Sequence, residues 1–368
     1  MANLKPRFLL LQVITPHYHQ ELALKNMAEL EQLVETYGGE VVEKSIQHRQ
    51  NPHPDMYIGS GKVEWLKETV RDKKIEVVVI NGIVKAGQLF RLTKALWEVH
   101  TRIKVWDRVD LILNIFDQHA STTEAKLQIE LARLQHSGPQ IYGLGRTELS
   151  RQAGGIGTRG GGETNIEKER RLIKKRTQEI RQKLTHIARN QQHKIHQRKA
   201  KNITSVALVG YTSAGKTTLF NALTSKERQE SQALFTTLDS VVGKLKISPH
   251  DPTVLISDTI GFIEDLPPFL IEAFRSTLME SLSADMLLHV IDAADPDMLL
   301  KMKVVKDILQ DLNVQQPHIL VFNKIDQVDT ERLAQFKKEY SGKNHFFVSA
   351  KTGEGLDELR QMIGKTLL

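Results

Sequence analysis

Residues 210–217 combine the features of a loop that binds a phosphate chain. They read Gly-Tyr-Thr-Ser-Ala-Gly-Lys-Thr and match the pattern G-x-x-x-x-G-K-[ST]. An apolar run at 206–209 precedes the loop and a helix-forming run at 219–223 follows it. The backbone N–H groups of such a loop, ending at a helix N-terminus, form an anion-binding concavity. The residues expected to contact phosphates are Gly210, Tyr211, Thr212, Ser213, Ala214, Gly215, Lys216, Thr217 and Thr218.

Four residues extend this site to the terminal phosphate and to a magnesium ion. Lys216 is expected to place its charge at the β- and γ-phosphates, and the Thr217 hydroxyl to ligate Mg²⁺. Asp258 ends a predicted strand, where its carboxylate can hold the same ion. Gly261 has no side chain, so its backbone can approach the γ-phosphate closely.

Two further segments indicate that the base is guanine. Residues 323–326 read Asn-Lys-Ile-Asp and residues 349–351 read Ser-Ala-Lys, and each segment follows a predicted strand. The Asp326 carboxylate can accept hydrogen bonds from guanine N1 and N2, which adenine cannot supply, and the Ala350 N–H can face guanine O6. The residues expected around the base are Asn323, Lys324, Asp326, Ser349, Ala350 and Lys351.

Two positions bear on hydrolysis. A threonine in the polar segment 232–240 is expected to close on Mg²⁺ when the γ-phosphate is present; Thr237 is the candidate and Thr236 the competing choice. Phe262 stands where many GTPases carry a glutamine that orients the attacking water. A phenyl ring cannot do this, so another residue or a partner positions the water, or intrinsic turnover is slow. The expected catalytic residues are Lys216, Thr237 and Gly261, and the expected metal ligands are Thr217, Thr237 and Asp258.

The site needs a strand–helix framework, and the pattern from 202 to 368 supplies one. Apolar runs of strand length alternate with helical stretches such as 269–283 and 356–367. A short turn at 248–252 joins two of the strands, which predicts one antiparallel edge on an otherwise parallel sheet. The predicted strands are 206–209, 241–247, 254–257, 286–291, 319–322 and 346–348.

The first 118 residues predict a second, smaller parallel α/β domain, because strand and helix patterns again alternate. The expected strands are 8–14, 41–42, 76–80 and 102–105, and the expected helices are 21–37, 62–73 and 86–99. Residues 59–62, Gly-Ser-Gly-Lys, only resemble a phosphate loop, since Val63 replaces the hydroxyl residue and the leading glycine is absent.

Residues 119–201 are expected to form an antiparallel helical hairpin. Leucines at 127, 131 and 134 recur at helical spacing, and a second apolar stripe runs from Ile173 to Ile187. The connector, about 140–164, is rich in glycine and arginine and suits close approach to RNA. It also contains G-x-G-x-x-G at 155–160, but no hydrophobic strand precedes it, which argues against a dinucleotide site.

The hairpin carries the basic excess of the chain. Residues 167–201 hold 13 Lys and Arg against 3 Glu, which more than accounts for the formal net charge of +7. Such a run reads as a nucleic-acid footprint or as a solvated charged helix, and we favour RNA. The expected RNA contacts are Arg159 at the connector and Lys174, Lys175 and Arg176 on the helix, which have no acidic residue between them.

Composition is consistent with a cytoplasmic globular protein. With 40% hydrophobic and 26% charged residues the chain is ordinary in composition, and no apolar run approaches membrane-spanning length. The N-terminus lacks a signal-peptide pattern, and the absence of cysteine excludes disulfides and thiolate chemistry. His193 and His196 could share a helix face, but a solvated face is favoured over a metal site.

These motifs resemble those of the HflX family of translation-associated GTPases over nearly the whole chain. The matching segments are Lys-Leu-Gln-Ile-Glu-Leu-Ala at 126–132, Gly-Gly-Ile-Gly-Thr-Arg-Gly at 154–160, the loop at 210–217, Leu-Phe-Thr-Thr-Leu-Asp at 234–239, Asp-Thr-Ile-Gly-Phe at 258–262 and Leu-Leu-His-Val-Ile-Asp-Ala-Ala at 287–294. The match at 234–239 favours Thr237 over Thr236. Two positions depart from the family pattern: Gly161 stands where proline is common, and Ser213 where asparagine is common.

The resemblance implies a GTPase that uses GTP, GDP and Mg²⁺, probes the large (50S) ribosomal subunit and its rRNA with the hairpin, and splits stalled ribosomes. We expect three domains: 1–118 (α/β), 119–201 (RNA-binding hairpin) and 202–368 (GTP-binding), in a monomer without a membrane anchor. Some family members also hydrolyse ATP or unwind RNA through the N-terminal half, so an RNA-remodelling ATPase is the alternative function. An RNA-modifying GTPase is disfavoured because no second catalytic constellation appears.

Overall fold

The chain folds into two compact units, each with its own sheet. One unit comprises Met1–Gln118 with Lys126–Lys183, and the other His119–Ala125 with Leu184–Leu368. The computed structural model describes residues 5–16, 20–136, 165–224, 241–245, 247, 253–259, 261–263, 267–274, 282–314, 316–340 and 344–367. Within these residues no helix is both long and apolar enough to cross a membrane.

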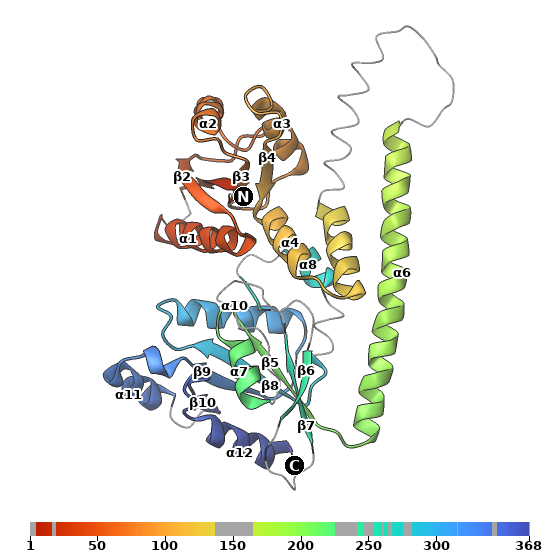
Figure 1. The fold of residues 1–368 in the computed structure, drawn as a ribbon, viewed down its shortest axis with the longest axis vertical. Coiled ribbons are helices and arrows are strands. Elements are labelled where there is room, and N and C mark those ends of the chain that lie inside the picture. The colour runs from red at the N-terminus through yellow and green to blue at the C-terminus, as the bar shows by residue number, and fades with distance from the viewer. Residues whose placement is uncertain are drawn as a thin grey trace. The chain divides into compact units, whose positions relative to one another are not determined.

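The sheet of the first unit is fully parallel, as predicted. Its strands are β1 (Arg7–Ile14), β2 (Glu40–His48), β3 (Val77–Ile80) and β4 (Lys104–Asp107), in the order β2-β1-β3-β4 (Figure 1). Every residue of β3 is buried, as a central strand covered on both faces requires. Strand β2 has 9 residues, whereas the sequence suggests only its two valines. Every fourth side chain of β2 is exposed and the others are partly buried, so no alternation of apolar and polar residues marks its full length.

Helices cover both faces of this sheet. They are α1 (Gln20–Tyr37), α2 (Ser60–Asp72), α3 (Ala86–Leu96) and α4 (Arg108–His119). Apolar side chains of α2 and α3 pack with Leu9 and Leu11 of β1, whereas Tyr37 at the end of α1 contacts the ring of Phe8, whose side chain points to the other face. The sequence pattern does not reveal α4, because apolar residues are too dense in it to show a helical period.

The phosphate-loop look-alike at 59–62 is the start of α2. Gly59 is the N-cap of this helix, and its N–H donates to Oε1 of Gln47 at 3.1 Å. The Lys62 ammonium lies 3.2 Å from the ring centroid of Trp65. The lysine therefore stacks on an aromatic ring of its own helix, which agrees with the rejection of this segment as a phosphate loop.

The two helices of the predicted hairpin are present, and each unit holds part of them. The first spans 123–136, and the second is α6 (Asn165–Ala200); the connector expected at 140–164 lies outside the described residues. Ile180 and Leu184 of α6 are buried, as the apolar stripe predicts. The side chain of Glu130 meets Arg176, and that of Glu124 meets Gln191. Partners that rise along one helix while they fall along the other make the pair antiparallel.

The second unit has a six-stranded sheet with the predicted antiparallel edge. The strands are β5 (Ser205–Gly210), β6 (Val241–Leu245), β7 (Val254–Asp258), β8 (Met286–Asp292), β9 (His318–Asn323) and β10 (His345–Phe347), in the order β10-β9-β8-β5-β7-β6 (Figure 1). Only β6 with β7 pairs antiparallel. The predicted strand bounds hold to within one or two residues.

Helices again cover both faces of this sheet. Side chains of α7 (Lys216–Leu223) and α12 (Leu356–Leu367) pack with Val206 and Leu208 of β5 in one core cluster. Side chains of α10 (Met298–Asp311) and α11 (Thr330–Glu339) pack in another, with Ile291 and Phe322 from the opposite face. The helix predicted at 269–283 begins as α8 (Pro268–Ala273), and 275–281 lie outside the described residues.

Candidate functional site

The loop between β5 and α7 has the backbone that a phosphate cradle needs. Gly215, the N-cap of α7, is left-handed at φ 86°, and Ser213 is also left-handed at φ 60°. A Cβ on Gly215 would lie 2.3 Å from Nδ2 of Asn323. Only glycine fits here, because both the backbone conformation and the neighbouring amide exclude a side chain.

Lys216 is folded back over the loop. Its ammonium donates to the carbonyl oxygens of Tyr211 at 2.7 Å and Gly210 at 3.1 Å, and its side chain is buried. Burial lowers the pKa of Lys216 to about 8, although the nearby Asp258 carboxylate acts in the opposite direction. Among the described residues its hydrogen bonds go to two neutral carbonyl oxygens, so an arriving phosphate gains a strong ionic contact with the ammonium.

The two expected metal ligands that can be seen lie in contact. The Thr217 hydroxyl donates to Oδ2 of Asp258 at 2.9 Å, and Asp258 is fully buried at the end of β7. A hydroxyl beside a carboxylate, next to a phosphate cradle, is a donor set that suits Mg²⁺. The third expected ligand, Thr237, lies outside the described residues, as does Thr236.

Gly261 lies close to the phosphate loop, as its expected role requires. A Cβ at this position would stand 2.9 Å from Cγ2 of Thr212 and 3.0 Å from Nζ of Lys216. The backbone of Gly261 can therefore reach a group bound at the lysine only because it has no side chain. Among the described residues the hydroxyl of Thr212 is buried without a hydrogen-bond partner, as befits a polar group in a ligand site.

Phe262 does not reach into the site with its side chain. The residue is 2% exposed, and its backbone pairs with the loop: its N–H donates to the Gly210 carbonyl at 3.1 Å, and its carbonyl accepts from the Thr212 N–H at 2.7 Å. The ring is part of the apolar interior. Such burial is what a phenylalanine that fills a hydrophobic pocket would show.

The predicted base-binding segments converge on the same loop. Asn323, at the end of β9, donates through Nδ2 to the Ala214 carbonyl at 3.0 Å and accepts through Oδ1 from the Ala350 N–H at 3.0 Å. The Ser349 hydroxyl donates to Oδ1 of Asp326 at 2.6 Å. The amide of Asn323 thus ties the phosphate loop to the Ser-Ala-Lys segment, and Ser349 orients the carboxylate expected to recognise guanine.

Sequence comparisons with known proteins point to the same kind of site. Three family models match: "GTP-binding GTPase N-terminal" over residues 24–117, "GTP-binding GTPase Middle Region" over 119–198 and "50S ribosome-binding GTPase" over 205–324. The GTPase HflX of Caldanaerobacter subterraneus subsp. tengcongensis is 40% identical, covering 100% of this chain and 82% of its own length. That of Escherichia coli is 36% identical, covering 95% and 81%. The chain belongs to the HflX family of ribosome-associated GTPases.

A solved structure supports the same assignment for this HflX-family chain. The crystal structure of SsGBP in complex with GDP is 27% identical in sequence and superimposes with a TM-score of 0.52. The match covers 98% of this chain and 99% of that one. The protein is therefore a GTP hydrolase with a guanine-nucleotide site. GTP or GDP fits the residues present. The loop glycine leaves room for phosphates, the buried Lys216 offers them a positive charge, and the Thr212 hydroxyl, which has no hydrogen-bond partner among the described residues, can donate to an oxygen of the ligand.

The motifs assigned no role to one residue at the edge of the site, although it lies in the segment 287–294 that matches the family. Asp292, the last residue of β8, accepts from the Lys324 ammonium through Oδ2 at 2.6 Å. It ends the strand next to the one that carries Asn323, and the two residues pair in register. The signal was available, because a carboxylate at the C-terminal end of a parallel strand lies on the edge where such sheets bind ligands.

The residues expected to contact RNA have different surroundings. Lys174 and Lys175 are exposed on α6. Arg176 instead donates to both carboxylate oxygens of Glu130, from Nε at 2.6 Å and from Nη2 at 2.8 Å. No acidic residue lies between these three positions, as the sequence showed, but Arg176 has acidic neighbours further away: Glu130 on the other helix and Glu179 on its own helix, at 3.6 Å. Arg159 lies outside the described residues.

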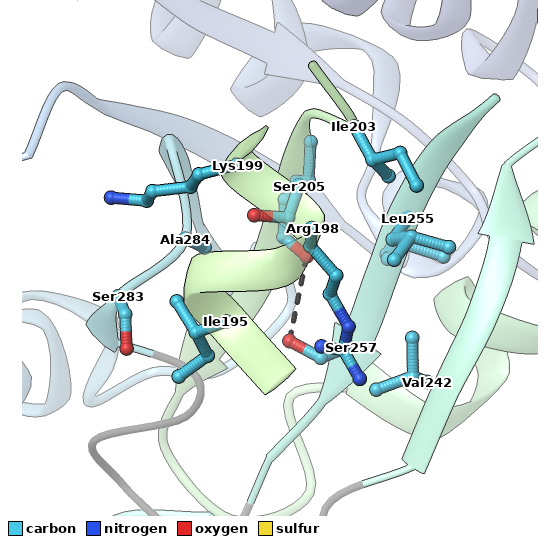
Figure 2. Close-up of a pocket in the computed structure, with 12 residues that line it drawn as sticks. Ile195, Arg198, Lys199, Ile203, Ser205, Val242, Leu255, Ser257, Ser283 and Ala284 are labelled. Atoms are coloured by element: carbon cyan, nitrogen blue, oxygen red, sulfur yellow. Dashed lines mark hydrogen bonds between the residues drawn. The ribbon is translucent and has the colours of Figure 1, made fainter. Parts of the chain in front are cut away.

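A small pocket in the same unit is separate from the nucleotide site. Ile195, Arg198 and Lys199 of α6 line it together with residues of β5, β6 and β7 (Figure 2). Ser205, which lines it, is the first residue of β5, whereas the phosphate loop follows Gly210 at the other end of that strand. The pocket therefore marks where the end of α6 joins the sheet.

Proposed function

We propose that this HflX-family GTPase binds the 50S ribosomal subunit and couples GTP binding and hydrolysis to the splitting of stalled ribosomes. Mg²⁺ is held by Thr217, Asp258 and Thr237, and the nucleotide state acts as the switch. The match of residues 205–324 to a model described as a 50S ribosome-binding GTPase supports the choice of subunit.

The observation that carries the proposal is the exposed basic surface of α6. Lys174 and Lys175 project from a helix 36 residues long, and among the described residues neither forms an ion pair. Adjacent like charges repel each other, and a polyanion offsets that repulsion. Ribosomal RNA is the polyanion that the family assignment suggests. Arg176 acts differently in this proposal, since its pairing with Glu130 holds the two helices together.

The connector is assigned the second step. Arg159 stands among glycines, and we propose that it inserts closely into RNA while the basic helix anchors the protein. Replacing Arg159 by Ala is expected to leave most of the affinity for 50S subunits and to impair splitting. Measuring both quantities on one variant separates anchoring from insertion.

The proposal is tested by co-sedimentation with 50S, 30S and 70S particles and by following 70S dissociation. We expect retention on 50S with a non-hydrolysable GTP analogue, weaker retention with GDP, and release of free subunits from 70S only with the triphosphate. Lys216→Ala is the nucleotide-binding control and should abolish the difference between nucleotides. Equal sedimentation with 30S and 50S, whatever the nucleotide, would contradict the proposal.

A further inference from the structure

Asp292 belongs to none of the nucleotide-binding motifs, yet both of its carboxylate oxygens are engaged at the edge of the site. Oδ1 accepts from the Ala294 N–H at 3.0 Å, which fixes the carboxylate relative to its own backbone. Oδ2 accepts from the Lys324 ammonium at 2.6 Å. The two side chains are 19% and 27% exposed, so the ion pair is largely shielded from solvent and stronger than a surface pair.

Lys324 runs from the base-binding segment across the phosphate loop. Its backbone is left-handed at φ 62°, between strand β9 and the short helix η1 (Ile325–Gln327) that carries Asp326. Its Cε lies 3.9 Å from the position that a Cβ on Gly215 would take. The aliphatic stem therefore passes beside the loop glycine, while the ammonium is held at the end of β8.

From these contacts we infer that Asp292 is a positioning residue for the guanine nucleotide: it holds the Lys324 side chain across the phosphate loop, so that the stem forms one wall of the nucleotide site before the nucleotide arrives. A lysine has four rotatable bonds and samples many rotamers when its head is free. Fixing the head in advance removes an ordering cost that binding must otherwise meet. The carboxylate acts only through Lys324 and touches no reacting atom.

The chain provides a matched control three residues further on. Asp295 accepts from the Lys301 ammonium at 2.5 Å, and this ammonium lies 5.1 Å from the ring centroid of Tyr211. The pair resembles Asp292–Lys324 in chemistry and in place, but its lysine comes from α10 rather than from the base-binding segment. Asp295→Asn therefore reports the loss of a nearby aspartate–lysine pair without loss of the lysine wall.

The test measures GDP and GTP affinity of the full chain by titration calorimetry for Asp292→Asn, Asp292→Glu and Asp295→Asn. We expect Asp292→Asn to weaken both nucleotides by about tenfold, which corresponds to about 1.4 kcal/mol. Asp292→Glu should recover part of the loss, and Asp295→Asn should stay within about twofold of the parent chain. The single-turnover hydrolysis rate at saturating GTP should be nearly unchanged in Asp292→Asn, since the carboxylate acts through Lys324.

A double-mutant cycle separates positioning from a general structural role. In a Lys324→Met background, Asp292→Asn should cause no further loss of affinity, because the ammonium that Asp292 holds is gone. A thermal melt without nucleotide accompanies each variant. The inference fails if Asp292→Asn binds GDP as tightly as the parent chain, or if it causes the same loss with and without Lys324. Neither result would affect the assignment of the GTPase site itself.

Discussion

The carbonyl oxygen of Phe262 accepts a hydrogen bond from the Thr212 N–H at 2.7 Å, while the Phe262 ring is 2% exposed. The position that carries the water-orienting glutamine in many GTPases is thus tied to the phosphate loop through its backbone, with its side chain turned into the interior. We therefore expect slow intrinsic hydrolysis that rises by at least about tenfold on 50S subunits, or about 1.4 kcal/mol of added transition-state stabilisation. Steady-state rates with and without subunits measure this.

The same burial predicts the effect of restoring the glutamine. Phe262→Gln should not raise the intrinsic rate, because the amide would occupy an apolar pocket and lack partners there. We expect it to destabilise the protein instead. The free energy of unfolding should fall by about 2–4 kcal/mol, as in a large-to-small core substitution, and the melting temperature should fall with it. A fast isolated enzyme that 50S subunits leave unaffected would contradict this view of residue 262.

Guanine selectivity should depend on Asp326. Asp326→Asn replaces an acceptor by an amide that presents a donor to guanine, and it also disturbs the hydrogen bond from Ser349. Affinity for GTP should fall by about 100-fold or more, and selectivity should shift toward xanthine nucleotides, whose 2-oxo group accepts from the amide. Competition binding with GTP, ATP and XTP is the measurement. Equal affinity of the unmodified chain for ATP and GTP would exclude this role.

Lys216→Ala should abolish turnover without unfolding the protein. The lysine is buried, and burial lowers its pKa to about 8. The charged form of this side chain is therefore disfavoured in the folded protein without nucleotide. Removing it should leave the melting temperature of the nucleotide-free chain unchanged or higher, while GTP hydrolysis falls below detection. Thr217→Ala should likewise abolish turnover, through the loss of a Mg²⁺ ligand. Retained hydrolysis in Lys216→Ala would show that the phosphate loop is misassigned.

A cluster in the first unit predicts a pH dependence of stability. Burial and then the Asp107 carboxylate raise the pKa of Asp110 to about 6. Burial alone would lower the pKa of His136, but its hydrogen bond to Asp107 at 3.0 Å and the two carboxylate charges raise it overall. Both groups hold their protons more tightly in the folded state, so their contribution to stability is largest at low pH and is lost as the pH rises through the folded pKa values.

Asp110→Asn should isolate this contribution, because asparagine is a permanent analogue of the neutral acid. The variant should match the parent below about pH 3.5, where the carboxyl is protonated in both the folded and the unfolded state, and become more stable than it at about pH 7.5, by on the order of 3 kcal/mol. Hydrogen exchange of α4, which Asp110 caps through its hydrogen bond with the Asp107 N–H, gives a local readout. A difference that does not change with pH would contradict the assignment.

The sequence predicted both sheets, and it predicted that the motif segments meet at one sheet edge, because these signals are local. The phosphate loop, the Asn-Lys-Ile-Asp segment and the Ser-Ala-Lys segment each follow a strand whose apolar run is visible, and parallel strands bring their ends to one edge. The positive φ of Gly215 is a direct consequence of the loop pattern. Strand bounds could be given to within one or two residues for the same reason.

What the sequence could not show are contacts between segments far apart in the chain. The pairing of Arg176 with Glu130 joins residues 46 positions apart, and that of Lys324 with Asp292 joins residues 32 apart. No periodicity or motif reports such a pair, since each carboxylate is ordinary in its own segment. Helix α4 was missed for the opposite reason, because its burial on nearly all sides erases the helical period.

The proposal that α6 anchors the protein to ribosomal RNA is tested most directly by a salt titration of 50S binding. Lys174→Gln with Lys175→Gln removes two exposed charges from α6; Lys337→Gln with Lys338→Gln removes two exposed, adjacent charges from α11 and serves as the matched control. With a GTP analogue bound, the α6 variant should bind more weakly, and its plot of log affinity against log salt should flatten by about two units, one for each lysine that no longer neutralises a phosphate. The α11 variant should keep the slope of the parent chain. If the α6 variant binds 50S subunits like the parent at every salt concentration, the basic helix is a solvated face and the account is wrong.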